Sequence, residues 1–132
     1  MSSSFNDHVG LRIQESRDGR SRCTLVVQPF HGNTAGVVHG GALFTLADTS
    51  MGAALVSTLA PGEFCATIEI KMAYFKAVRE GTVLCETQIL HRGKSVASLE
   101  STLTVDGVLV SRASGSFAIL RRKADPPSNS GG

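Results

Sequence analysis

One amphipathic helix flanked by strand patterns is the feature that most constrains how this chain folds. Over residues 39–59, apolar side chains recur at the i, i+3, i+4, i+7 spacing of a helix. Glycine and alanine are frequent there, and each glycine inside a helix costs about 1 kcal/mol relative to alanine. We therefore expect this helix to approach a sheet, a partner or a ligand closely, since burial alone would explain the alanines better than Gly40 and Gly41.

The segment before the helix has the pattern of a β-hairpin. Residues 9–15 and 23–28 are short apolar runs, and Asp18-Gly19 between them is a strong two-residue turn signal. Pro29 closes the second run, and the following residues have neither helical nor strand periodicity. We expect a hairpin followed by a loop that leads into the helix.

The segment after Pro61-Gly62 predicts a meander of four strands, with its best turn at Asp106-Gly107. These strands are expected at residues 66–78, 82–90, 95–105 and 108–120. In the first of them, alternation predicts one face formed by Ile68, Ile70, Met72 and Tyr74. This order of elements predicts an α+β fold whose mostly antiparallel sheet can wrap the one long helix.

The length of 132 residues fits one domain with one core. We assign residues 1–120 to that domain. Residues 121–132 combine charge with proline, serine and glycine, a composition that buries little apolar surface, so a disordered tail is expected there.

Composition narrows the class of protein. Thirteen basic and 11 acidic residues give a formal charge of +2, which is not the pattern of a nucleic-acid-binding protein. Cys23, Cys65 and Cys85 lack zinc-ligand spacing and are expected to be buried free thiols, with no metal site. The sequence has no signal-peptide core and nothing near the roughly 20 apolar residues of a membrane span, so we expect a cytoplasmic protein.

Asp48 and Gly40 are the residues on the helix that point to chemistry. Asp48 interrupts an apolar helix, where burial of an unpaired carboxylate is costly, so it is either a pocket acid or a solvent-facing structural one. Gly40 is expected in the first helical turn, where a free backbone N–H can stabilise the oxyanion formed when a carbonyl is attacked. His39 beside it could equally be a structural cap.

The spacing of these two residues predicts an oligomer. Gly40 and Asp48 are eight residues apart, which is about 12 Å of rise along a straight helix. One substrate carbonyl can hardly contact both within a subunit. If they cooperate, one chain supplies the oxyanion donor and another the acid, at a subunit interface.

Residues 33–52, NTAGVVHGGALFTLADTSMG, closely resemble the helix region of hotdog-fold acyl-CoA thioesterases of the PaaI-like, phenylacetate-pathway type. The order of elements agrees up to about Leu120. The resemblance implies a sheet wrapped around a central helix, subunits that pair into a continuous sheet, and pairs that associate as tetramers. It also implies hydrolysis of an aryl, arylacetyl or medium-chain acyl-CoA without a metal or redox cofactor.

The resemblance also assigns roles to individual residues. It implies that Asp48 is a general base or nucleophile, that Gly40 supplies the oxyanion N–H, and that Asn33 places the water or the thioester. His39 would orient that loop, and Thr67 would help to hold the water unless it is an ordinary strand residue.

Two further assignments concern the CoA moiety. The turn at residues 91–95 resembles the part of the family that lies near the CoA nucleotide, so Arg92 and Lys94 could contact phosphates, or could be ordinary solvated turn residues. Two alternatives to a thioesterase remain at this point: a hotdog-type acyl-CoA hydratase or dehydratase, and a non-catalytic acyl-CoA binding module.

Overall fold

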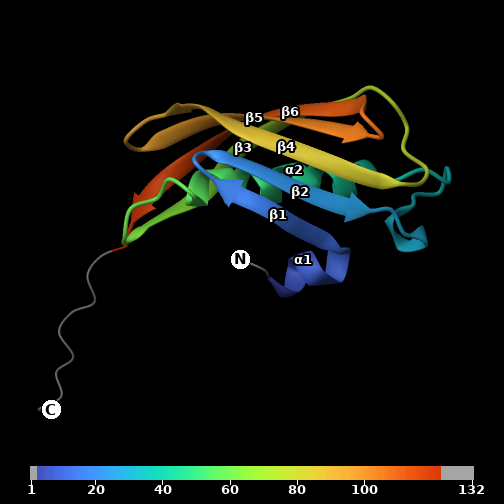
Figure 1. The fold of residues 1–132 in the computed structure, drawn as a ribbon, viewed down its shortest axis with the longest axis horizontal. Coiled ribbons are helices and arrows are strands. Elements are labelled where there is room, and N and C mark those ends of the chain that lie inside the picture. The colour runs from blue at the N-terminus through green and yellow to red at the C-terminus, as the bar shows by residue number, and fades with distance from the viewer. Residues whose placement is uncertain (1–2, 123–132) are drawn as a thin grey trace, which may run out of the picture.

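Six strands and one long helix make up most of the fold. The computed structural model describes residues 3–122. Its elements are α1 (Ser4–Val9), β1 (Leu11–Arg17), β2 (Arg20–Val26), the 3-10 helix η1 (Pro29–His31), α2 (Gly40–Val56), β3 (Glu63–Tyr74), β4 (Thr82–Arg92), β5 (Val96–Val105) and β6 (Val108–Arg121). The strands form one antiparallel sheet that arches over α2 (Figure 1). This arrangement confirms the predicted α+β hotdog fold.

The two Asp-Gly turns form the predicted hairpins. Asp18 and Gly19 adopt φ angles of 51° and 77°, and Asp106 and Gly107 adopt 48° and 78°. Positive φ at both central residues matches the right-handed twist of the flanking strands, so these turns join antiparallel neighbours directly. They connect β1 to β2 and β5 to β6.

The predicted meander is wrong in one respect. The strand order is β1-β2-β4-β5-β6-β3, so β3 pairs with β6 and not with β4, which follows it in the chain. Strand β4 instead lies between β2 and β5. As a result, β3 forms one edge of the sheet.

Two element boundaries also differ from the prediction: the start of the first strand and the end of the long helix. The first strand begins at Leu11, because the preceding residues form α1, which Gly10 terminates with a φ of 89°. Neither α1 nor η1 was predicted, since α1 has no buried residue and therefore leaves no apolar periodicity to detect. Helix α2 ends at Val56, three residues before the predicted end.

A β-bulge changes which residues of β3 face the helix. Thr67 lies opposite Phe117 and Glu69 lies opposite Ser116, so Ile68 is an extra residue without a partner. The predicted inward position of Ile68 is therefore wrong, and its side chain is 55% exposed. Thr67 takes the inward position instead, as does Tyr74 farther along the strand, opposite the buried Ser111.

The core lies between α2 and the sheet. Leu46, Met51 and Leu55 of α2 are fully buried there. The helix side chains pack tightly against Gly115 of β6, where an added methyl group would lie 2.7 Å from the sulfur of Met51. Among the helix glycines, Gly40 lies close to Tyr74 of β3, whereas Gly52 has no neighbour within 4 Å in the described chain, so approach of Gly52 to a partner or ligand stays a prediction.

The remaining sequence expectations concern the chain ends and the thiols. Strand β6 continues through Arg121, one residue past the predicted domain boundary, and most of the predicted tail lies outside the described residues. Cys23 and Cys85 are buried free thiols as predicted, whereas Cys65 is only half-buried. Within residues 3–122, no helix has the length and apolar character needed to cross a membrane.

Candidate active site

Asp48 is held by a side chain from the edge strand. It lies near the middle of α2 and is half-buried, and its Oδ1 accepts a hydrogen bond of 2.7 Å from the Thr67 hydroxyl of β3. Thr67 is exposed, so the carboxylate can be approached from the edge of the sheet. No basic side chain pairs with Asp48 in the described part of the chain. Thr67 therefore orients one oxygen of a half-buried carboxylate, and the role of Asp48 as a pocket acid stays a prediction.

Cys65 is a neighbour of Asp48 that sequence reasoning missed. It precedes Thr67 by two residues on β3, and both side chains face α2 because strand residues alternate. Burial, and then the negative charge of Asp48, raise the pKa of the Cys65 thiol. The thiol therefore stays protonated near neutral pH and competes poorly as a nucleophile. The i, i+2 spacing from Thr67 was the signal that could have found it.

The first turn of α2 is organised by two side chains. His39 is the N-cap, and its Nδ1 accepts the Gly41 N–H at 2.8 Å. The Gly40 carbonyl accepts a hydrogen bond of 2.8 Å from the Tyr74 hydroxyl. In the described structure no hydrogen bond uses the Gly40 N–H, as expected for the first residue of a helix. This N–H is available to a ligand.

Asn33 organises its own loop. Its Oδ1 accepts the N–H groups of Ala35 at 2.9 Å and Val37 at 3.3 Å. The side chain is exposed, and within residues 3–122 it makes no hydrogen bond with Asp48. A role for Asn33 in placing water or the thioester stays a prediction.

The loop and the helix start are joined through a buried histidine that was not singled out from the sequence. His31 is 4% exposed, and its backbone carbonyl accepts the His39 N–H at 2.8 Å. Its ring accepts the Gln28 N–H at 2.9 Å and contacts the Val9 carbonyl at 2.6 Å. Because the ring nitrogen facing Gln28 accepts, the proton lies on the nitrogen that faces Val9. His31 therefore ties α1 to the segment that precedes α2.

The two residues proposed to contact CoA have different surroundings. The guanidinium of Arg92 lies 2.9 Å from the Glu63 carboxylate and donates to the Gly93 carbonyl at 2.9 Å. Arg92 therefore joins the end of β4 to the start of β3, which favours its structural role. Lys94 is exposed in the turn after β4 and makes no ion pair within residues 3–122. It remains the better candidate for a phosphate contact.

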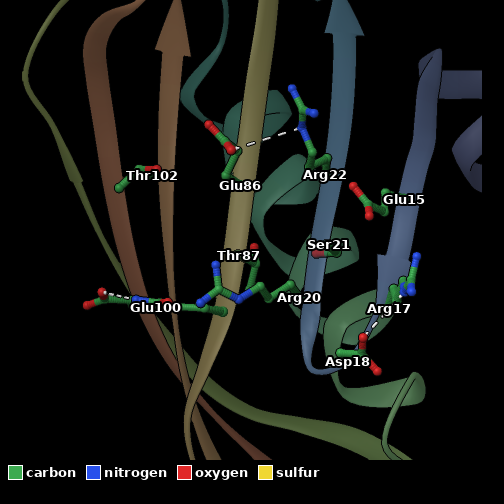
Figure 2. Close-up of a pocket in the computed structure, with 11 residues that line it drawn as sticks. Glu15, Arg17, Asp18, Arg20, Ser21, Arg22, Glu86, Thr87, Glu100 and Thr102 are labelled. Carbon is green, nitrogen blue, oxygen red and sulfur yellow. Dashed lines mark hydrogen bonds and ion pairs between the residues drawn. The ribbon is translucent and has the colours of Figure 1, made fainter.

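One hollow on the sheet lies away from these residues. It has a volume of about 620 Å³ and is lined by charged side chains of β1, β2, β4 and β5 (Figure 2). Its charges are partly paired within the chain, with Arg17 3.3 Å from Asp18 and Arg22 4.0 Å from Glu86. Exposed pairs of this kind are common on solvated sheet faces. None of the predicted site residues lines it.

A smaller hollow adjoins the helix start. It measures about 280 Å³, and its lining includes Gly40, Leu43, Tyr74, Phe75 and Lys76. This space is small for an acyl-CoA, and Asp48 does not line it. Within residues 3–122, no group of three or more His, Cys, Asp or Glu side chains is placed to hold a metal ion.

The chain is similar to known proteins over most of its length. A family model described as the thioesterase superfamily matches residues 35–110, a region that includes every predicted site residue except Asn33. A conserved protein from Pseudomonas aeruginosa of known structure is 35% identical, with a TM-score of 0.88, and the match covers 91% of this chain and 96% of that one.

Two further relatives extend the comparison. An Archaeoglobus fulgidus protein named as a candidate esterase is 35% identical over 91 residues, which cover 68% of this chain but only 57% of the relative. A mutant of the phenylacetic acid degradation protein PaaI from Thermus thermophilus is 21% identical, with a TM-score of 0.83, and the match covers 89% of this chain and 100% of that one. This last likeness establishes a shared fold.

Proposed function

Because this chain belongs to the thioesterase superfamily, we propose that it hydrolyses an acyl-CoA thioester to a free acid and CoA, with Asp48 as the catalytic carboxylate. The observation that carries the proposal is the hydrogen bond from Thr67 to Asp48 at an exposed sheet edge. It holds one carboxylate oxygen and leaves the other free to react. The substrate class proposed is an aryl, arylacetyl or medium-chain acyl-CoA.

The proposed chemistry needs only groups of the protein and water. The Gly40 N–H polarises the thioester carbonyl and stabilises the oxyanion as the carbonyl carbon is attacked. In one route Asp48 removes a proton from the attacking water, and in the other its free oxygen attacks and forms an acyl-enzyme that water then hydrolyses. In both routes the carbon–sulfur bond breaks and the CoA sulfur leaves with a proton.

A second copy of the chain completes the proposed site. Gly40 and Asp48 lie on the same helix, about 12 Å apart along its axis. Strand β3 is a 12-residue edge strand whose other side is unpaired in the described chain. Ile68 within β3 and Phe75 directly after it are each 55% exposed. Long apolar edge strands readily pair with another chain. The proposal places the second copy along β3 and includes further association of pairs into a tetramer.

The test is release of free CoA thiol from a panel of aryl, arylacetyl and aliphatic acyl-CoA substrates. Asp48→Asn and Asp48→Ala should lower kcat by about 10²- to 10⁴-fold, because loss of a general base or nucleophile has an effect of that size. Circular dichroism and thermal melting serve as folding controls. Full turnover in a folded Asp48 variant would contradict the proposal.

The same assay separates the alternatives. If acyl-CoA raises the melting temperature without thiol release, the protein is a binding module. If the acyl chain gains or loses water while the thioester stays intact, it is a hydratase or dehydratase. Mass spectrometry of the products distinguishes these outcomes from hydrolysis.

A further inference from the structure

Tyr74 contacts the part of α2 that carries the proposed oxyanion donor, whereas the sequence pattern predicted only its place on the inner face of the strand. Its hydroxyl donates to the Gly40 carbonyl at 2.8 Å. Its ring also fills the space beside the glycine, since a methyl group added at Gly40 would lie 3.2 Å from the ring. Tyr74 therefore restrains Gly40 both by a hydrogen bond and by contact.

The peptide group between Gly40 and Gly41 is held at both of its polar atoms. Tyr74 binds its carbonyl oxygen, and the Nδ1 of His39 binds its N–H. Two consecutive glycines have unusually free backbone angles, so without such contacts this turn would sample several orientations. The Gly40 N–H belongs to the preceding peptide group, whose His39 carbonyl accepts the Ala42 N–H at 2.9 Å. The peptide groups on both sides of Gly40 are therefore restrained, and with them the first turn that carries this N–H.

The bulge in β3 allows one strand to make both the Tyr74–Gly40 contact and the Thr67–Asp48 contact. Thr67 and Tyr74 are seven residues apart, and in a regular strand an odd spacing places two side chains on opposite faces. The extra residue Ile68 restores the same face for both. One strand thus positions the carboxylate through Thr67 and the helix start through Tyr74.

We propose that Tyr74 is a positioning residue for hydrolysis, which acts through the Gly40 carbonyl to hold the first turn of α2 so that the Gly40 N–H points at the developing oxyanion. This inference rests on the proposed thioesterase function. Burial also raises the pKa of Tyr74, so the phenol remains a hydrogen-bond donor across neutral and mildly alkaline pH. Tyr74 therefore adds no ionisation of its own to the pH profile in that range.

The test compares Tyr74→Phe with the control Ser111→Ala. Tyr74→Phe keeps the ring and removes only the hydroxyl. Ser111 of β6 lies opposite Tyr74 and its hydroxyl donates to the Ala73 carbonyl of β3 at 2.7 Å, so the control loses a similar hydrogen bond to β3 that does not involve the helix. The comparison separates a general loss of protein stability from a loss of the position of the Gly40 N–H.

Tyr74→Phe should lower kcat about tenfold and leave KM nearly unchanged, since the lost contact acts on the transition state more than on substrate binding. In Tyr74→Phe, the rate of amide hydrogen exchange at residues 40–42 should increase. Ser111→Ala should keep the wild-type kcat. A wild-type kcat in Tyr74→Phe, an equal loss of kcat in Ser111→Ala, or unchanged exchange at residues 40–42 would each overturn the inference.

Failure of the proposed function gives a different result. If the wild-type protein releases no thiol from any substrate, both the thioesterase proposal and the catalytic role of Tyr74 fall. If the wild-type protein and Tyr74→Phe hydrolyse substrate equally while Asp48→Ala does not, only the inference about Tyr74 is wrong.

Discussion

At Asp48, one hydrogen bond orients the carboxylate that we propose to be catalytic. The hydroxyl of Thr67 occupies Oδ1, so the side chain cannot rotate freely and its second oxygen points to a defined place. Cys65 stands on the same face of β3 and stays protonated, so it does not add a second negative charge. The carboxylate thus has a neutral hydrogen-bonding neighbour and no ion-pair partner within residues 3–122.

Thr67→Val tests this residue-scale interpretation. The substitution keeps the branched shape and removes the hydroxyl, and we expect a kcat lowered about tenfold because the carboxylate loses its orientation. Thr58→Val is the matched control, since the Thr58 hydroxyl bonds only to the Leu55 carbonyl at the end of the helix. Steady-state kinetics of both variants provide the measurement. Equal activity of the two variants would mean that Thr67 is an ordinary strand residue.

At the scale of elements, Glu63 joins the start of β3 to its neighbours. Its carboxylate accepts the Ala60 N–H at 2.8 Å and lies 2.9 Å from Arg92 of β4 and 3.6 Å from Arg121 of β6. The Ala60 N–H, and then Arg92, lower the pKa of Glu63 below its ordinary value of 4.5. The folded state therefore prefers the ionised carboxylate more strongly than the unfolded state does.

This preference gives a pH-dependent contribution to stability. Because the pKa of Glu63 is lower in the folded protein, its contribution to stability is fully present above about pH 4.5. That contribution is lost as the pH falls through the pKa of Glu63 in the folded protein. Glu63→Gln keeps an acceptor for the Ala60 N–H and removes the charge. We expect its melting temperature to lie below that of the wild type at pH 7 and to converge with it on acidification below pH 4.5. A gap that stays constant with pH would contradict this account.

At the scale of the whole molecule, the single chain separates the two halves of its proposed chemistry. The Gly40 N–H lies at the start of α2 and Asp48 at its middle, whereas the edge strand that supports both contacts is open to a second copy. If each site takes Gly40 from one chain and Asp48 from another, a dimer of two different inactive variants should regain activity. A site contained within one chain predicts no such recovery.

Gly40→Pro and Asp48→Ala provide that test. Proline is common at the first position of a helix and removes the N–H, but its ring also crowds Tyr74, where an added Cβ would lie 3.2 Å away, so circular dichroism and melting serve as folding controls. Each variant alone should lose about 10²-fold or more in kcat. If each site uses Gly40 from one chain and Asp48 from the other, a heterodimer regains one intact site. Random pairing of co-expressed variants should then restore about a quarter of wild-type activity. No recovery in isolated heterodimers would show that the site is not shared in this way.

Local interactions explain which parts of the molecule the sequence determined by itself. The Asp-Gly turns adopt positive φ because those two residue types tolerate it, and the helix follows from its own apolar period. Asp48 and Gly40 could be singled out for the same reason: the helix alone sets their spacing. The fold class followed from the order of these local elements and from the family resemblance.

Contacts between distant segments decided the rest. The pairing of β3 with β6, the bulge at Ile68 and the pairing of Arg92 with Glu63 join residues that no local pattern relates. The alternation of β3 predicted Ile68 on the inner face, and only the register against β6 placed Thr67 there instead. The alternation correctly predicted Tyr74 on the inner face, but the position of Cys65 beside the helix follows from that register, because the residue at which a bulge shifts the alternation depends on the strand with which β3 pairs.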